Sequence, residues 1–212
     1  MIEKLQFITQ QNEKFTHLTA MEAALKAGVK WVQLRVKDQS ADVVTDHAFK
    51  AMQLCDEYGA KLIINDYPLI AKETGAAGVH LGKDDVTVDQ ARKILGPDKI
   101  IGGTANTVQD IIGHERNGAD YIGLGPFRFT TTKKKLSPVL GLEGYRQILK
   151  ECTKRGIRVP IIAIGGIEII DIPSLLGAGV YGIAASSLII RNDISNTIKT
   201  INEILKVEKH YA

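Results

Sequence analysis

Features that would place this chain in a specialised class of protein are scarce in its sequence. Only 2 of the 212 residues are cysteines, Cys55 and Cys152, and both lie in helix-like segments far apart in the chain. We therefore expect reduced thiols rather than a disulfide or a metal-binding pair. No apolar run approaches the length of a membrane span, and the N-terminal segment has no apolar signal core. These absences favour a cytoplasmic protein without a membrane segment.

An excess of charge of one sign is also missing. The 27 Lys and Arg residues exceed the 24 Asp and Glu residues by only 3, which is too little to indicate a nucleic-acid partner. Hydrophobic residues make up 44% of the chain and charged residues 24%, as in ordinary globular proteins. Local basic clusters can still serve anionic small molecules, and these are the partners we expect.

The sequence does contain a regular alternation of short apolar runs with longer amphipathic stretches, several of which end in a glycine turn. This pattern predicts alternating strands and helices. The predicted strands are Leu5–Thr9, Trp31–Lys37, Lys61–Asp66, Gly78–Leu81, Lys99–Thr104, Tyr121–Pro126, Pro160–Gly165 and Tyr181–Ser186. The predicted helices are Ala20–Gly28, Ala41–Tyr58, Pro68–Thr74, Val88–Leu95, Val108–Asn117, Leu142–Arg155, Ile172–Leu176 and Ile194–Lys206.

Eight strand–helix units leave two main architectures, an open doubly wound sheet and a closed barrel. The even spacing and the lack of an inserted segment favour the barrel. The turn after the first strand, residues 9–12, has no glycine, which argues against a dinucleotide site. We therefore predict an α/β fold, a single-domain (β/α)8 TIM barrel over residues 1–212. The apolar stretch Val43–Leu54 suits either core packing or subunit contact, which leaves a homo-oligomer open.

The second predicted strand alternates polar and apolar residues. Gln33, Arg35 and Lys37 fall on one face, and the apolar residues between them suit the face that the helices cover. The polar set is therefore expected to point into the barrel. Buried cations need an anion, which is either an internal carboxylate or a ligand. A structural ion pair or a solvated strand end explains the same pattern.

Acidic residues follow the next two strands. The third ends in Asn65-Asp66, and Asp84 and Asp85 follow the fourth. Because neighbouring strands lie about 5 Å apart, Asp66 and Asp85 can meet at the barrel mouth, where two carboxylates and phosphate oxygens would suit Mg²⁺. Asp85 is equally explained as a favourable acid at a helix start, and spacing alone does not separate it from Asp84.

Hydroxyl-rich and glycine-rich segments follow the later strands. Thr104 ends the fifth strand, and the loop after the sixth runs through residues 130–135, three threonines and three lysines, which is typical of either a cationic lid or a solvated loop. Gly166 follows the seventh strand, and Ser186 and Ser187 end the eighth. Barrels frequently bind phosphate between these last two loops.

Taken together, these motifs resemble those of the thiamin-phosphate synthase family. They are Gln33 to Lys37, Asn65-Asp66, residues 80–85, Gly125-Pro126 with the Thr/Lys loop, and residues 164–166, in that order along most of the chain. The resemblance implies a (β/α)8 barrel that joins hydroxymethylpyrimidine diphosphate to a thiazole phosphate. It also implies Mg²⁺, release of pyrophosphate, and a dissociative mechanism in which pyrophosphate leaves first.

The resemblance also assigns roles by position. Arg35, Lys37 and Lys133 would be the catalytic cations, and Asp66 and Asp85 the Mg²⁺ ligands. Gln33, Asn65 and Thr104 would join the cations around the pyrimidine diphosphate. Thr130, Thr132, Gly166, Ser186 and Ser187 would bind the thiazole phosphate.

The chain departs from the family's usual pattern at three positions: Tyr67 replaces an arginine, Phe129 a proline and Lys135 an acid. Three alternatives stay open: a thiazole tautomerase, a non-catalytic paralogue that binds thiamin precursors, and an unrelated phosphate-binding barrel enzyme such as one of tryptophan synthesis. Thiazole tautomerases lack the Gln-Arg-Lys strand and the Thr/Lys loop. The unrelated barrel enzyme would not predict a carboxylate pair for Mg²⁺.

Overall fold

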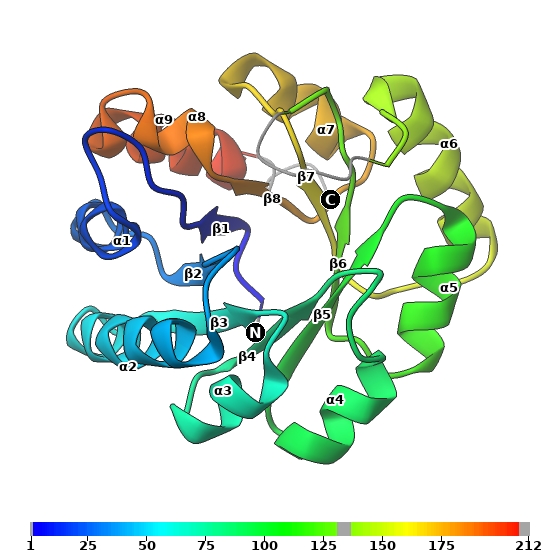
Figure 1. Ribbon diagram of the computed structural model, residues 1–212. Helices are drawn as coiled ribbons and strands as arrows, with labels where there is room; N and C mark the ends of the chain where they lie inside the picture. Colours follow the sequence, from blue (N-terminus) through cyan, green and yellow to red (C-terminus); the bar gives the residue numbers. More distant parts are fainter. Residues whose placement is uncertain (1, 131–136, 208–212) are drawn as a thin grey trace.

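The chain forms a closed barrel of parallel strands in sequence order, surrounded by helices (Figure 1). The computed structural model describes residues 2–130 and 137–207. This arrangement confirms the predicted α/β barrel. The strands are β1 Leu5–Ile8, β2 Trp31–Leu34, β3 Lys61–Asn65, β4 Gly78–Leu81, β5 Ile100–Ala105, β6 Tyr121–Leu124, β7 Ile161–Ile164 and β8 Gly182–Ala185.

Helices connect consecutive strands and cover the outside of the barrel (Figure 1). They are α1 His17–Lys26, α2 Ala41–Glu57, α3 Pro68–Glu73, α4 Val88–Leu95, α5 Val108–Arg116, α6 Gly141–Lys154, the 3₁₀ turn η1 Ile169–Asp171, α7 Ile172–Gly177, α8 Ser187–Ile190 and α9 Ile194–Val207. Among the described residues, no helix is both long enough and apolar enough to cross a bilayer. In α2, Val44, Ala48 and Ala51 are buried, whereas Phe49 is exposed.

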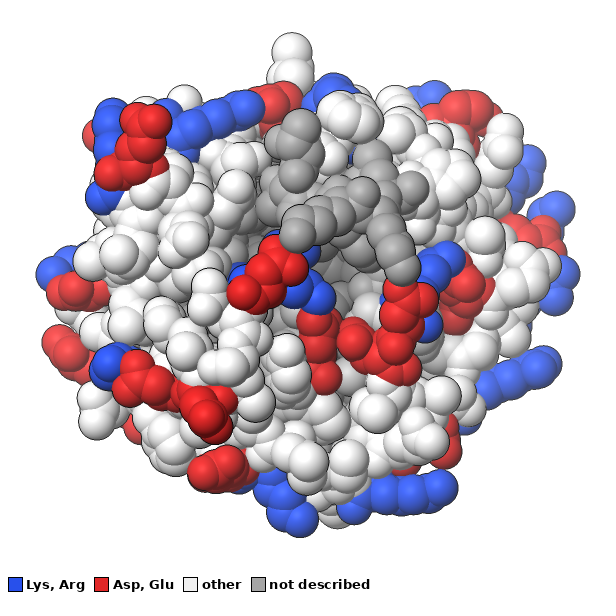
Figure 2. All heavy atoms as spheres, in the orientation of Figure 1, with Lys and Arg blue, Asp and Glu red and all other residues white. Residues whose placement is uncertain are grey.

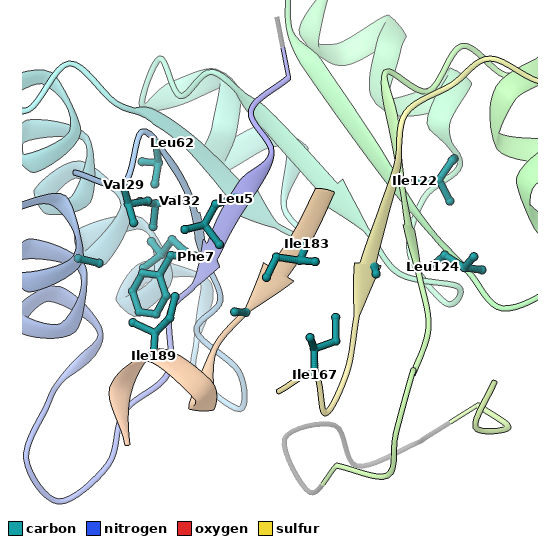
Figure 3. Packing of buried hydrophobic residues seen from close by; sticks show 14 of the residues in the cluster. Leu5, Phe7, Val29, Val32, Leu62, Ile122, Leu124, Ile167, Ile183 and Ile189 are labelled. Atoms are coloured by element: carbon teal, nitrogen blue, oxygen red, sulfur yellow. The ribbon is translucent and has the colours of Figure 1, made fainter. Parts of the chain in front are cut away.

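The period-2 alternation of the strands separates two apolar layers. Outward-facing strand residues such as Phe7, Val32 and Leu62 belong to the large cluster that packs against the helices (Figure 3). A smaller cluster, which includes Trp31, Ile63 and Tyr121, fills the inside of the barrel. The barrel is thus packed on both faces of its sheet.

Local signals account for where several helices begin. Ser40 accepts a hydrogen bond from the backbone N–H of Val43 at the start of α2, and Thr107 forms a capping box at α5. Helix α1 begins at His17, earlier than the predicted Ala20, because Thr16 and Thr19 form a reciprocal capping box. The short helix α8 was not predicted.

The second strand is shorter than predicted. β2 ends at Leu34, and the backbone N–H of Arg35 donates to the side-chain oxygen of Thr9 at 3.0 Å rather than to a strand carbonyl. The prediction that Arg35 and Lys37 belong to the strand is therefore wrong, although both line a cavity at the mouth of the barrel together with Gln33. Both belong to the loop that follows β2, and only Gln33 of that alternating set lies in the strand.

Candidate active site at the mouth of the barrel

A cavity of about 600 Å³ lies at the carboxyl ends of the strands. Acidic and basic side chains gather next to one another near the centre of this face (Figure 2). Nearly all of the residues predicted from the sequence line the cavity: Gln33, Arg35, Lys37, Asn65, Asp66, Asp85, Thr104, Thr130, Gly166, Ser186 and Ser187. Thr132 and Lys133 lie outside the described residues. The barrel thus brings together side chains from most of its strand–helix loops.

Two carboxyl groups lie side by side on one wall of the cavity. Asp66 follows β3 with a φ of 69°, a left-handed conformation that few residues other than glycine adopt, and its backbone N–H donates to the carbonyl of His80 at 2.8 Å. Asp85 accepts a hydrogen bond from the backbone N–H of Gly82 at 2.6 Å and lies within hydrogen-bond distance of Asp66. Of the two candidate acids after β4, Asp85 is therefore the one that faces Asp66.

The environment of Asp85 favours its protonated form. Burial, together with the neighbouring Asp66 carboxyl group, raises the pKa of Asp85 to about 6, although the Gly82 N–H and Lys37 oppose this rise. Two carboxyl groups this close together are a site that a cation can occupy. Within the described parts of the chain, no third acid, His or Cys completes a metal-binding cluster, so any further ligands would come from substrate or water.

Two cations lie next to this pair. Lys37 forms an ion pair with Asp66. Arg35 is largely buried; burial lowers the pKa of its guanidinium, whereas Asp66 and Asp38 raise it. The guanidinium stays protonated at neutral pH, because an arginine starts far above that range. The result is a partly desolvated positive charge beside the acids, which a bound anion would stabilise.

Polar side chains continue from this wall into the barrel. Gln33 is 2% exposed and donates to Gln6 at 3.0 Å. Thr104, on β5, lies 3.0 Å from Nε2 of His80, and Nδ1 of the same ring lies 2.9 Å from the hydroxyl of Tyr121. The floor of the cavity is therefore a hydrogen-bonded network rather than an apolar surface.

The opposite side of the cavity is built from backbone and hydroxyl groups. Gly165 and Gly166 follow β7 with φ of 93° and 66°, and a Cβ at Gly166 would lie only 2.9 Å from the Arg128 carbonyl oxygen. Ser186 precedes the first turn of α8, and its hydroxyl donates to Gln10 at 3.1 Å. Glycine backbone and serine hydroxyls next to a helix N-terminus are typical of phosphate sites in barrels.

Comparison with known proteins identifies the family. Residues 5–189 match the family described as thiamine monophosphate synthase. A protein of Phocaeicola vulgatus named thiamine-phosphate synthase is 49% identical over 201 residues, which cover 94% of this chain and 97% of that protein. A protein of the same name from Flavobacterium johnsoniae is 48% identical over 97% of both chains.

The chain belongs to the thiamine monophosphate synthase family. Among solved structures, a thiamine phosphate pyrophosphorylase from Pyrococcus furiosus superposes with a TM-score of 0.82 at 28% identity and covers 99% of this chain and 97% of its own. The family assigned from the sequence motifs is thus confirmed. The fold of this family also explains why the polar residues gather at one end of the barrel, since the carboxyl ends of all its strands meet there.

Some residues that shape this family's cavity were not found from the sequence. Arg128 donates to both carboxylate oxygens of Asp171, at 2.8 and 2.9 Å, and to the carbonyl of Gly166 at 2.6 Å. It thereby ties the loop after β6 to the loop after β7. Asn106 donates to the backbone carbonyls of Gly125 and Pro138, and so holds the same loop after β6. Both roles depend on contacts between distant segments, for which no local pattern exists.

Proposed function

We propose that this protein is a cytoplasmic thiamine-phosphate synthase. It would join hydroxymethylpyrimidine diphosphate to a thiazole phosphate, giving thiamin phosphate and pyrophosphate. The observation that carries this proposal is one cavity whose two ends carry groups suited to anions, in a chain that belongs to this family. One end has the cations and paired acids, and the other has the glycine and serine loops. Two phosphorylated substrates would place their charged groups at these two ends.

The cationic end suits the diphosphate. Arg35 and Lys37 lie on one loop beside the cavity, and Lys133 would join them from the loop after β6. Negative charge accumulates on pyrophosphate as its bond to the methylene carbon breaks. Cations that are already in position stabilise that charge more in the transition state than in the bound substrate, so they accelerate departure.

The acid pair fits a magnesium ion. Asp66 and Asp85 offer two carboxylates in contact, and Mg²⁺ is usually held by one or two carboxylates together with substrate phosphates and water. When bound, the ion would neutralise part of the charge on the diphosphate. Lys37, which contacts Asp66, would then be available to the same anion.

The glycine and serine end suits the thiazole phosphate. Gly166 allows the backbone to approach the ligand closely, and Ser186 and Ser187 add hydroxyls and the N–H groups of the first turn of α8. Thr130 lines the same cavity, and Thr132 would extend this set.

The chemistry we infer for this cavity is a substitution without a protein nucleophile. The bond between the methylene carbon and the diphosphate oxygen breaks first, and its electron pair leaves with pyrophosphate. The aminopyrimidine ring stabilises the resulting cation until the lone pair of the thiazole nitrogen forms the new carbon–nitrogen bond. The protein would hold the two rings in line and exclude water from the cation.

A direct assay tests this function. Purified protein is mixed with both substrates and Mg²⁺, and thiamin phosphate and pyrophosphate are measured together. We expect equal amounts of the two products. Isomerised thiazole phosphate without coupling would indicate a tautomerase, and binding of the substrates without any turnover would indicate a non-catalytic paralogue; either result would overturn the proposal.

A further inference from the structure

A continuous chain of hydrogen bonds crosses the inside of the barrel beneath the cavity. It runs from Gln33 on β2 to Gln6 on β1 at 3.0 Å, and from Gln6 to Tyr121 on β6 at 3.2 Å. It continues from Tyr121 to His80 on β4 at 2.9 Å and ends at Thr104 on β5 at 3.0 Å. The two ends of this chain, Gln33 and Thr104, line the cavity, and so does His80. The five residues of the chain of hydrogen bonds lie on five different strands.

The positions of the protons follow from which groups can donate. An amide NH₂ only donates, and the NH₂ group of Gln6 donates to the oxygen of Tyr121 at 3.2 Å. The proton of the Tyr121 hydroxyl is therefore directed to its remaining neighbour, Nδ1 of His80. Burial raises the pKa of Tyr121 well above its usual range, so the hydroxyl keeps this proton at neutral pH.

The same reasoning fixes the two ends. A ring nitrogen that accepts a hydrogen bond is itself unprotonated, so the proton of the His80 ring lies on Nε2, which donates to Thr104. The threonine hydroxyl then directs its own proton into the cavity. At the other end, the NH₂ group of Gln33 donates to Gln6, which leaves its carbonyl oxygen as the group that faces a ligand.

The packing around Tyr121 and His80 holds this arrangement in place. A Cβ at Gly102 would lie 2.2 Å from the Tyr121 ring and 2.6 Å from Nδ1 of His80, so only glycine leaves room for both rings. The ring of Trp31 packs edge-on against Tyr121, with 4.8 Å between the ring centres. Because the rings cannot easily turn, the direction of the hydrogen bonds is fixed before any ligand binds.

We propose that Gln6, Tyr121 and His80 are positioning residues that give the cavity one acceptor, at Gln33, and one donor, at Thr104, and thereby select an aminopyrimidine over its oxo counterpart. This inference rests on the proposed function and names the group that distinguishes its substrate. An aminopyrimidine offers an N–H donor on its amino group and a lone pair on the adjacent ring nitrogen. The 4-oxo ring offers an oxygen and a ring N–H at the same two places. Its oxygen would therefore face the acceptor at Gln33, and its N–H would face the donor at Thr104.

The first experiment measures the direction of the hydrogen bonds without any ligand. The protein is labelled with ¹⁵N-histidine, and the ring nitrogens of His80 are assigned by their loss in His80→Gln. We expect a neutral ring at pH 7.5 with the proton on Nε2. A proton on Nδ1, or on both nitrogens, would reverse or abolish the arrangement and overturn the proposal. This result does not depend on whether the protein couples the two substrates.

The second experiment measures selection by calorimetry. Hydroxymethylpyrimidine diphosphate and its 4-oxo analogue are titrated separately into the full-length protein with Mg²⁺ and without thiazole phosphate. We expect the amino compound to bind about 100-fold more tightly, since the oxo ring leaves buried polar groups unpaired. Equal affinity of the two compounds, or tighter binding of the oxo compound, would overturn the proposal even if the coupling assay succeeds. If the coupling assay fails, the same measurement still decides the selectivity.

A matched pair of variants assigns the selection to the network. Tyr121→Phe removes the central hydroxyl and should reduce the preference for the amino compound to about 10-fold or less, with an unchanged KM for thiazole phosphate. Tyr145→Phe is the control, because this tyrosine is equally buried but, within the described part of the chain, its hydroxyl bonds only to backbone groups of Leu124 and Ile164. It should keep the full preference. If both variants lost the preference for the amino compound to the same extent, the role of the network would be structural and the proposal would be refuted.

Discussion

Replacement of Gly166 by alanine tests how closely the phosphate-binding end of the cavity is packed. Gly166 has a φ of 66°, and a left-handed conformation costs an alanine about 1–2 kcal/mol. Its new Cβ would also lie 2.9 Å from the Cβ and from the carbonyl oxygen of Arg128. Overpacking of this kind typically costs about 1–3 kcal/mol more. We therefore expect Gly166→Ala to lower the free energy of unfolding by about 2–5 kcal/mol.

Two other glycines separate the two contributions. Gly156 has a φ of 71°. Among the described residues, apart from its chain neighbours, none has an atom within 4 Å of the position that an alanine methyl group would take, so Gly156→Ala measures the conformational cost alone, about 1–2 kcal/mol. Gly113 lies within α5 at an ordinary φ with open space around it, and Gly113→Ala should stabilise the protein by about 0.5–1 kcal/mol. The loss of unfolded-state entropy is the same in all three variants and cancels in the comparison.

Urea denaturation of the three variants gives the stability differences, and steady-state kinetics gives the effect on the site. If the backbone must move away from Arg128 to accept the methyl group, Gly166→Ala should also raise the KM for thiazole phosphate, whereas Gly156→Ala should leave it unchanged. Equal destabilisation by Gly166→Ala and Gly156→Ala would refute the close approach to Arg128. An unchanged KM for thiazole phosphate would refute the placement of the phosphate at this end.

Three further predictions concern charge, pH and capping. Asp85→Asn should lower turnover about 10-fold or more and weaken the dependence of turnover on Mg²⁺ concentration, because a carboxylate ligand is lost. The control Asp89→Asn, on the exposed start of α4, should change neither quantity. An unaltered Mg²⁺ response of Asp85→Asn would show that the ligand is another residue. Burial and neighbouring positive groups lower the pKa of His17 from 6.5 to about 4. Between these pH values the unfolded chain binds a proton at this residue and the folded chain does not. The contribution of His17 to the free energy of unfolding is therefore complete above pH 6.5 and is lost as the pH falls toward 4. His17→Gln should flatten the fall in unfolding free energy across that window, and an identical slope would contradict the assignment. Thr16→Ala should cost about 1 kcal/mol by removing the capping box of α1, as seen in urea denaturation, while Thr200→Ala on the surface of α9 should cost nothing measurable.

Sequence patterns predicted the architecture because the signals involved are local. Alternating apolar runs and amphipathic stretches mark strands and helices, and a parallel barrel needs little more than their even spacing. The membership of the family was also accessible, because its motifs fall at strand ends, where any barrel collects its functional residues. The end of β2 was less accessible. The alternation of Gln33, Arg35 and Lys37 continues past Leu34, whereas the hydrogen bonds of the strand do not.

Contacts between distant segments decided the rest. Spacing could not separate Asp84 from Asp85, and it was the turn at Gly82 that directed Asp85 toward Asp66. The chain of polar groups inside the barrel joins residues up to 115 positions apart, so no window of sequence contains it. A local feature of the sequence that belongs to this chain of polar groups is Gln6, which lies at an inward position of an otherwise apolar strand. The sequence by itself determined which residues reach the mouth of the barrel. The tertiary structure alone decided which of them touch and in which direction their hydrogen bonds run, because a hydrogen bond depends on the position of both partners.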